Sequence, residues 1–168
     1  LDRGSDVVLT LEHGTPRRIT DSPGQERSVS FSPDGKSVLY AGERDGSWNL
    51  YRTDRTDEKE AAFFNATALK ESAVLATPAE EFQPRFSPDG QEVAYLEERT
   101  TLKVLNLKSG QVRTVLPGER NYSYADGDQW YEWSPDGKWF LVQYGLPERV
   151  MTPEIGLVAA DGKGEIVN

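Results

Sequence analysis

Phe31-Ser32-Pro33-Asp34-Gly35, Phe86-Ser87-Pro88-Asp89-Gly90 and Trp133-Ser134-Pro135-Asp136-Gly137 are three copies of one five-residue pattern in a chain of 168 residues. Proline presets the φ of the second turn position, and glycine accepts a left-handed backbone that closes a tight reversal between two strands. One Ser-Pro-Asp-Gly segment is a common surface turn, whereas three copies with matched flanks indicate an internal repeat. The sequence therefore predicts three equivalent units, each with a β-hairpin at this turn.

The spacing of the copies favours a β-propeller. The serines are 55 and 47 residues apart (32 to 87 and 87 to 134), which suits a four-stranded unit with one insertion. No convincing run of apolar residues at helical spacing is present. Apolar residues recur six and seven positions after each serine, as in a strand buried on both faces: Val38 and Leu39, Val93 and Ala94, Phe140 and Leu141. We expect an all-β fold of four-stranded antiparallel blades, with about three complete blades plus a half blade.

The blades are predicted to form a single propeller segment over residues 1–168. The expected limits are 1–20 for the half blade, 21–77 for a blade with an insertion at 54–66, 78–118 for the next blade and 119–168 for the last. Two local alternatives stay open: residues 61–75 could form a short helix instead of an outer strand, and the last blade departs from the repeat at Gly145-Leu146. Because an open arc leaves sheet faces bare and no initiator methionine is present, we expect a part of a longer chain or an association between copies.

Composition limits the possible partners. The net charge of −9, with scattered acidic residues, argues against nucleic acid and anionic membrane surfaces. No run of about eighteen apolar residues is present for insertion into a membrane, and the first residues do not form a signal peptide. Since the chain has no cysteine, it has neither disulfides nor a thiolate nucleophile.

The sequence predicts no catalytic residue, cofactor or metal within these 168 positions. His13 is the only histidine, in a turn context, and no Gly-x-Ser-x-Gly nucleophile elbow occurs. One histidine also cannot build a multi-histidine zinc site. Asp126 and Asp128 could give oxygen ligands to a calcium ion, but the other ligands of a calcium loop are missing, so a loop capped by its own side chains is favoured.

The repeat resembles a known family. The turn, the apolar strand after it and the segment from Glu43 to Tyr51 look like the propeller repeat of TolB and of tricorn-type proteases, over nearly the whole chain. The aromatic-rich run from Asn121 to Trp139 looks like that of bacterial tricorn-like peptidases of the Bacteroidetes type. In that family the propeller is noncatalytic and a separate carboxy-terminal region, often with a PDZ module, holds the serine nucleophile. The resemblance implies a periplasmic or cell-envelope scaffold that binds or gates peptides.

Five residues are the candidates for binding a peptide or protein partner. Aromatic side chains offer contact area with polar donors, and arginine offers a fork for carboxylates: Tyr122, Tyr124, Trp130, Arg44 and Arg99. For the aromatic residues, core packing is the competing interpretation, and Trp133, which shares the repeat position of Phe31 and Phe86, is assigned to the core between blades. For the arginines, bracing of adjacent blades is favoured over binding.

Three functions agree with these observations. The first is the noncatalytic propeller of a tricorn-like serine peptidase, whose remaining blades and catalytic region lie in the parent chain. The alternatives are a TolB-like protein-interaction module of the cell envelope and the propeller of a prolyl-oligopeptidase-type enzyme.

Overall fold

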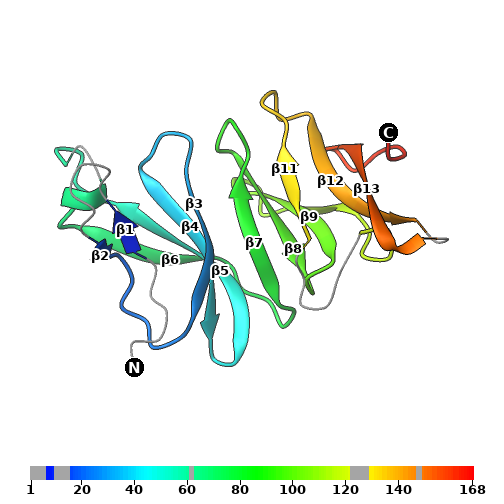
Figure 1. The fold of residues 1–168 in the computed structure, drawn as a ribbon. Helices are drawn as coiled ribbons and strands as arrows, with labels where there is room; N and C mark the ends of the chain where they lie inside the picture. The colour runs from blue at the N-terminus through cyan, green and yellow to red at the C-terminus, as the bar shows by residue number, and fades with distance from the viewer. Residues whose placement is uncertain (1–6, 10–15, 61–62, 122–128, 147–148) are drawn as a thin grey trace. The chain divides into compact units, whose positions relative to one another are not determined.

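The structure is a computed structural model that describes residues 7–9, 16–60, 63–121, 129–146 and 149–168 (Figure 1). Thirteen strands and one short 3-10 turn, η1 (Phe63–Asn65), make up the regular structure of these residues. No α-helix is present in the described part of the chain, and so none there has the length and apolarity to cross a membrane. The expected all-β class is confirmed.

The first compact unit, Leu1–Arg85, holds a two-stranded and a four-stranded sheet. The small sheet pairs β1 (Val7–Leu9) with β2 (Pro16–Arg18), as expected for the half blade. The larger sheet has the order β3-β4-β5-β6, with the bounds Glu26–Phe31, Ser37–Arg44, Ser47–Arg55 and Leu69–Leu75. Residues 69–75 form the strand β6. Of the short helix considered for 61–75, the described residues contain only the single turn η1.

The second unit, Phe86–Asn168, contains a three-stranded sheet and most of a four-stranded one. The four-stranded sheet has the order β10-β9-β8-β7, with the bounds Val112–Leu116, Thr101–Asn106, Glu92–Glu97 and Glu81–Phe86. The three-stranded sheet joins β11 (Tyr131–Trp133), β12 (Trp139–Leu146) and β13 (Arg149–Ala159). Each sheet follows the chain order, as in a blade meander. The proposed blade limits themselves stay a prediction.

The last sheet differs from expectation at its outer strand. A complete blade over 119–168 would have a fourth strand, but its described residues have only an isolated bridge between Leu157 and Val167, with N···O distances of 2.8 and 2.9 Å. Gly164 has a φ of 107°, a conformation outside the strand region, directly before this segment. At Gly145-Leu146, where the last blade departs from the repeat, β12 extends through Leu146, and β13 begins at Arg149.

The repeated turn is a hydrogen-bonded clamp. In the second copy the Gly90 amide donates to the Ser87 carbonyl oxygen over 2.9 Å, and the φ of Gly90 is 70°. Because the Ser87 carbonyl oxygen is directed to the Gly90 amide, the Glu92 amide donates to the Ser87 hydroxyl oxygen instead, over 2.9 Å. The same hydroxyl donates to Asp89 Oδ1 over 2.6 Å, and the Gln91 amide donates to that oxygen over 3.0 Å. The serine hydroxyl oxygen thus takes the place of the serine carbonyl oxygen as the acceptor for the first amide of the next strand.

The other two copies have the same clamp. Ser32 and Ser134 donate to Asp34 and Asp136 over 2.7 and 2.6 Å, and both accept a backbone amide at their hydroxyl oxygens. In all three copies, the serine hydroxyl is the largest influence holding the pKa of the aspartate below its ordinary value of 3.8, and a backbone amide adds to it. The three carboxylates are therefore ionised at neutral pH.

The second strand of each four-stranded sheet provides the core. Residues 38–41 of β4 and 93–96 of β8 are buried on both faces, as the repeat predicted, whereas in β12 only one face is buried. Phe31 departs from the expected core position. Its side chain is 53% exposed and meets Phe63 edge to face at 5.8 Å, whereas Phe86 and Trp133 at the same repeat position are half-buried. Trp133, at the same repeat position, packs on Phe140 with ring centroids 4.1 Å apart.

Replacing Ser87 by alanine tests the clamp. The variant leaves the Glu92 amide without its acceptor and Asp89 without its donor, so we expect the free energy of unfolding to fall by about 1–3 kcal/mol. Urea denaturation followed by circular dichroism measures the change. Ser109→Ala, in the turn before β10, is the control: the hydroxyl's bonds to Asn106 and from the Gln111 amide are exposed to water, so this variant should lose about 0.5 kcal/mol or less. Equal losses in the two variants would show that the clamp adds no special stability.

Candidate functional site

Two residues of the first unit have an unusual backbone at the same repeat position. Ser28 in β3 and Gln83 in β7 each lie four residues before the serine of a Ser-Pro-Asp-Gly turn, and their φ angles are 59° and 50°. For a residue other than glycine, this left-handed region costs roughly 1–2 kcal/mol. Strain that recurs at one position of a repeat points to a function for the conformation, because such costs gather at functional sites.

In β3 the left-handed residue belongs to a β-bulge. The register with β4 shifts between Arg27 and Ser30, so Ser28 and Val29 have no partner residue in the ladder. A bulge bends the strand and redirects its side chains, and bulges are frequent next to functional sites. As a result, the Val29 side chain is 50% exposed although it lies inside a strand.

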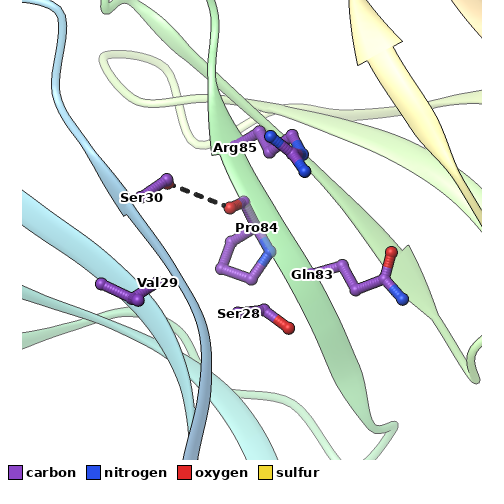
Figure 2. Close-up of a pocket in the computed structure, with 6 residues that line it drawn as sticks. All are labelled: Ser28, Val29, Ser30, Gln83, Pro84 and Arg85. Atoms are coloured by element: carbon purple, nitrogen blue, oxygen red, sulfur yellow. Dashed lines mark hydrogen bonds between the residues drawn. The ribbon is translucent and has the colours of Figure 1, made fainter. Parts of the chain in front are cut away.

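The bulge borders a small groove between β3 and β7, with a volume of about 140 Å³ (Figure 2). Its lining consists of Ser28, Val29, Ser30, Gln83, Pro84 and Arg85. The Ser30 hydroxyl donates to the Pro84 carbonyl oxygen over 3.2 Å and fixes one end of the groove. In Figure 2, Gln83 and Arg85 leave β7 on one side and Pro84 leaves it on the other, toward β3.

The groove lies between two end strands. β3 and β7 are each at the end of a four-stranded sheet, so one edge of each strand lacks a neighbour in its own sheet. Such an edge offers backbone donors and acceptors to an added chain segment, except where proline, here Pro84, has no N–H group. Together with the Ser28 hydroxyl, which Figure 2 shows directed toward β7, these edges can hold an extended peptide by hydrogen bonds.

Trp130 occupies the same repeat position in the third copy. Its side chain is 37% exposed and directly precedes β11, whereas the next residue, Tyr131, is buried and donates its hydroxyl to the Ala94 carbonyl oxygen over 3.0 Å. Trp130 lacks the left-handed φ of its two counterparts. The other aromatic candidates, Tyr122 and Tyr124, lie outside the described residues, as do His13, Asp126 and Asp128.

Arg44 ends β4 inside a charged cluster of the first unit. Its guanidinium lies 3.0 Å from a carboxylate oxygen of Glu26 and 3.5 Å from one of Glu71, and it stacks over the ring of Tyr51 at 4.7 Å. The Glu26 side chain is fully buried and also accepts a hydrogen bond from the Thr20 hydroxyl over 3.3 Å. This geometry is that of a brace between β3, β4 and β6. A ligand role for Arg44 stays a prediction.

The cluster continues to a buried tyrosine. The Tyr40 hydroxyl donates to a carboxylate oxygen of Glu71 and lies 3.2 Å from the hydroxyl of Thr53. Burial raises the pKa of Tyr40 well above its ordinary value of 10, and the bond to Glu71 raises it further. Tyr40 therefore stays protonated as a structural donor and is not suited to act as a base at neutral pH.

Arg99 has the same spacing from its turn as Arg44 but a different setting. It lies with Glu98 in the tight turn that joins β8 to β9, where the two residues have φ angles of 65° and 51°. The side chain is half-buried and has an interaction partner in the chain. Binding through Arg99 stays a prediction.

The repeated acidic residue at the start of these strands was missed by the sequence analysis. Glu26 and Glu81 each lie six residues before the turn serine, both are buried, and each accepts a hydrogen bond from a threonine, Thr20 or Thr77. Aligning the three copies upstream of the aromatic residue would have found this signal, because Asp128 has the same spacing in the third copy. No group of three or more potential metal ligands occurs among the described side chains.

Comparisons with known proteins support the propeller fold. No protein-family model matches the chain. The "Tol-Pal system protein TolB" of Bordetella pertussis is 43% identical over 37 residues, which are 22% of this chain and 8% of TolB. The structure of putative TolB from Agrobacterium tumefaciens aligns with a TM-score of 0.67 and 20% identity, over 95% of this chain and 55% of that one. This chain thus spans about half the length of that TolB.

Two enzymes share the fold. An oligogalacturonate lyase from Vibrio parahaemolyticus aligns with a TM-score of 0.59 and 15% identity, over 91% of this chain and 40% of the lyase. The acylaminoacyl peptidase of Pyrococcus horikoshii aligns with a TM-score of 0.54 and 15% identity, over 86% of this chain and 24% of the peptidase. At these identities the similarity establishes a TolB-like β-propeller fold alone, because one such fold serves binding proteins and enzymes.

Substitution by glycine tests the strain at the groove. Glycine adopts the left-handed region without penalty, so Ser28→Gly should raise the free energy of unfolding by up to about 1 kcal/mol. Ser30→Gly is the control in the same strand, where the φ is not left-handed and the bond to Pro84 is lost, and it should lower the stability. Chemical denaturation compares the two variants, and a loss of stability in Ser28→Gly would contradict the assignment of strain.

Substitution of Arg44 tests the brace. In Arg44→Leu the buried Glu26 carboxylate loses its counter-charge, and we expect a loss of about 3–5 kcal/mol in the free energy of unfolding. The control is Arg52→Leu, which breaks the more exposed pair with Asp54 and should cost about 1 kcal/mol or less. Similar losses measured by urea denaturation would mean that burial of Glu26 makes no difference.

Proposed function

We propose that this chain is a noncatalytic protein-interaction segment of a TolB-like β-propeller in the cell envelope. One observation carries the proposal: the groove between β3 and β7 combines two open strand edges, a repeated left-handed backbone and serine hydroxyls. This is a surface for holding an extended peptide segment of a protein partner. The periplasmic or envelope location rests on the short similarity to a protein of the Tol-Pal system.

The binding mode follows from the strand edges. In a propeller the first strand of each blade lines the central channel, so β3 and β7 would present their free edges there. An extended segment can then bind to the backbone at these edges, while its side chains enter the spaces between blades. The narrow channel of a propeller would admit such a segment and exclude a folded domain.

The proposal makes binding the role of this chain and leaves chemistry to other regions or proteins. A serine–histidine pair within the chain would have to use His13, the single histidine. Burial and the bond to Glu71 raise the pKa of Tyr40, so this hydroxyl is held as a donor and supplies no general base at neutral pH.

A propeller segment of a serine peptidase is the second candidate. The fold similarity to an acylaminoacyl peptidase and the aromatic run before β11 favour it. In a tricorn-like or prolyl-oligopeptidase-type parent, the same groove would bind or gate the peptide substrate for a catalytic region outside these 168 residues. The sequence of the full gene discriminates, because a peptidase requires a downstream region with a serine nucleophile.

Selection of peptides on the chain tests the function. Random 12-residue peptides displayed on phage are selected for binding, and the enriched peptides are synthesised for affinity measurements by fluorescence anisotropy. In Ser28→Ala the groove loses a serine hydroxyl, so we expect about fivefold weaker binding, the scale of one hydrogen bond.

The matched control is Gln91→Ala, whose exposed side chain follows the second Ser-Pro-Asp-Gly turn and should leave the affinity unchanged. Thermal unfolding of both variants checks that they remain folded. If no peptide is enriched, or if the enriched peptides bind Ser28→Ala as tightly as the unaltered chain, the proposed function is wrong.

A further inference from the structure

We infer that Asp45-Gly46, in the turn that joins β4 to β5, is a modification site at which the chain forms a succinimide and then isoaspartate. The reaction needs no enzyme or cofactor, and its one co-reactant is water. Neither residue lines the groove between β3 and β7, so the site is independent of the proposed function. Two observations point to it: the exposure of this turn, and the hydrogen bonds that other Asp-Gly pairs make.

The chemistry is a ring closure between an aspartate and the residue that follows it. The backbone nitrogen of that residue attacks the carboxyl carbon of the aspartate side chain, a C–N bond forms, and the carboxyl hydroxyl leaves with the amide proton as water. Water then opens the ring at either carbonyl and gives aspartate again or isoaspartate. Glycine favours closure because it has no side chain to obstruct the approach.

Residue type alone does not select one site, because the chain contains six Asp-Gly pairs. The pairs begin at Asp34, Asp45, Asp89, Asp126, Asp136 and Asp161. Asp126 lies outside the described residues, which leaves five pairs with a described environment.

Three of these pairs are held by the Ser-Pro-Asp-Gly clamp. The nucleophile is occupied, because the Gly35, Gly90 and Gly137 amides each donate to a serine carbonyl oxygen over 2.9 Å. The carboxyl group is occupied too, since one oxygen of each aspartate accepts the serine hydroxyl and a backbone amide. These bonds hold the pKa of the three carboxyl groups below their ordinary value, which reduces the fraction of protonated acid that can release water.

The pair at Asp161 is held in a similar way. Its carboxylate accepts the Lys163 amide over 2.9 Å, and the Gly162 amide donates to the Ala159 carbonyl oxygen over 3.0 Å. Gly162 is also crowded, because a side-chain carbon placed on it would lie 2.3 Å from the Thr114 carbonyl oxygen. The peptide unit of this pair therefore cannot turn without breaking a hydrogen bond.

Asp45-Gly46 has none of these restraints within the described part of the chain. Both residues are exposed, and their φ angles of 53° and 80° form a two-residue turn closed by the pairing of Arg44 with Ser47. Neither the Asp45 carboxylate nor the Gly46 amide makes a hydrogen bond or an ion pair with another described residue. Apart from its chain neighbours, nothing lies within 4 Å of a side-chain carbon placed on Gly46, so the amide has room to turn toward the carboxyl carbon.

The product would change the hairpin beside the brace at Arg44. Isoaspartate adds one side-chain carbon to the main chain, whereas a two-residue turn fits only a narrow set of backbone angles. Arg44, whose guanidinium pairs with the buried Glu26, is the last residue of β4 before this turn. The modification would therefore alter the pairing of Arg44 with Ser47 as the chain ages.

Incubation of the chain in water that carries a heavy oxygen isotope tests the site, because each opening of the ring adds one labelled oxygen. Peptide mapping by mass spectrometry measures the label at each Asp-Gly pair, and chromatography separates isoaspartate from aspartate. In the folded chain at mildly acidic pH, we expect label at Asp45 about thirtyfold faster than at the other four described pairs, the scale of two hydrogen bonds that closure would break there. In urea, where the fold is lost, the five rates should become similar.

Ser87→Ala is the matched variant, because it removes the hydroxyl that donates to Asp89. Labelling at Asp89 should then rise about fivefold, the scale of one hydrogen bond, relative to Asp34 and Asp136, which report any general loosening of the same chain. Equal labelling at the five pairs of the folded chain, or faster labelling at a pair other than Asp45, would overturn the inference. Unchanged labelling at Asp89 in Ser87→Ala would also count against it, because hydrogen bonds would then not be what protects the clamped pairs.

Discussion

The serine hydroxyl of each Ser-Pro-Asp-Gly turn is the group on which the architecture depends. The turn geometry directs the serine carbonyl to the glycine amide, and the next strand would begin with an unpaired amide if the hydroxyl did not accept it. The aspartate then accepts the hydroxyl proton and a second backbone amide at one oxygen. Because the serine hydroxyl, the glycine amide and the two amides after it each have an acceptor, the register between first and second strands is fixed within the turn itself.

A fixed register at one end of the hairpin also decides where irregularity can occur. The buried second strand, β4 in the first unit, cannot slip without exposing residues 38–41, so any extra residue must be accommodated in the end strand β3. The bulge at Ser28 and Val29 lies there, between the clamp and the buried Glu26. The left-handed backbone beside the groove is thus a consequence of two rigid attachments at the ends of a short strand.

The sequence predicted the parts of the fold that depend on local chemistry. Turn residues and apolar pairs can be recognised in a sequence because their conformational preferences act over a few positions. From them the positions of β4, β8 and the three turns were predicted correctly. The groove was not predicted, because neither serine nor glutamine signals a left-handed conformation; it arises from the bulge and from β7 of the next sheet. The exposure of Phe31 was likewise not predictable from the repeat, because Phe86 and Trp133 have the same repeat position and are half-buried.

Two arginines of the first unit show how the place of a residue in the sheet changes what its charge requires. Arg44 lies at the end of a buried strand, where Glu26 and Glu71 neutralise its charge and Tyr51 covers its face, so its guanidinium is used within the fold. Arg85 lies on the end strand β7, where its side chain is exposed and also has an interaction partner in the chain. A buried ion pair must be complete to offset the loss of hydration, whereas an exposed guanidinium keeps much of its water whatever its partner. Loss of the partner should therefore destabilise the fold at Arg44 and have little effect on it at Arg85.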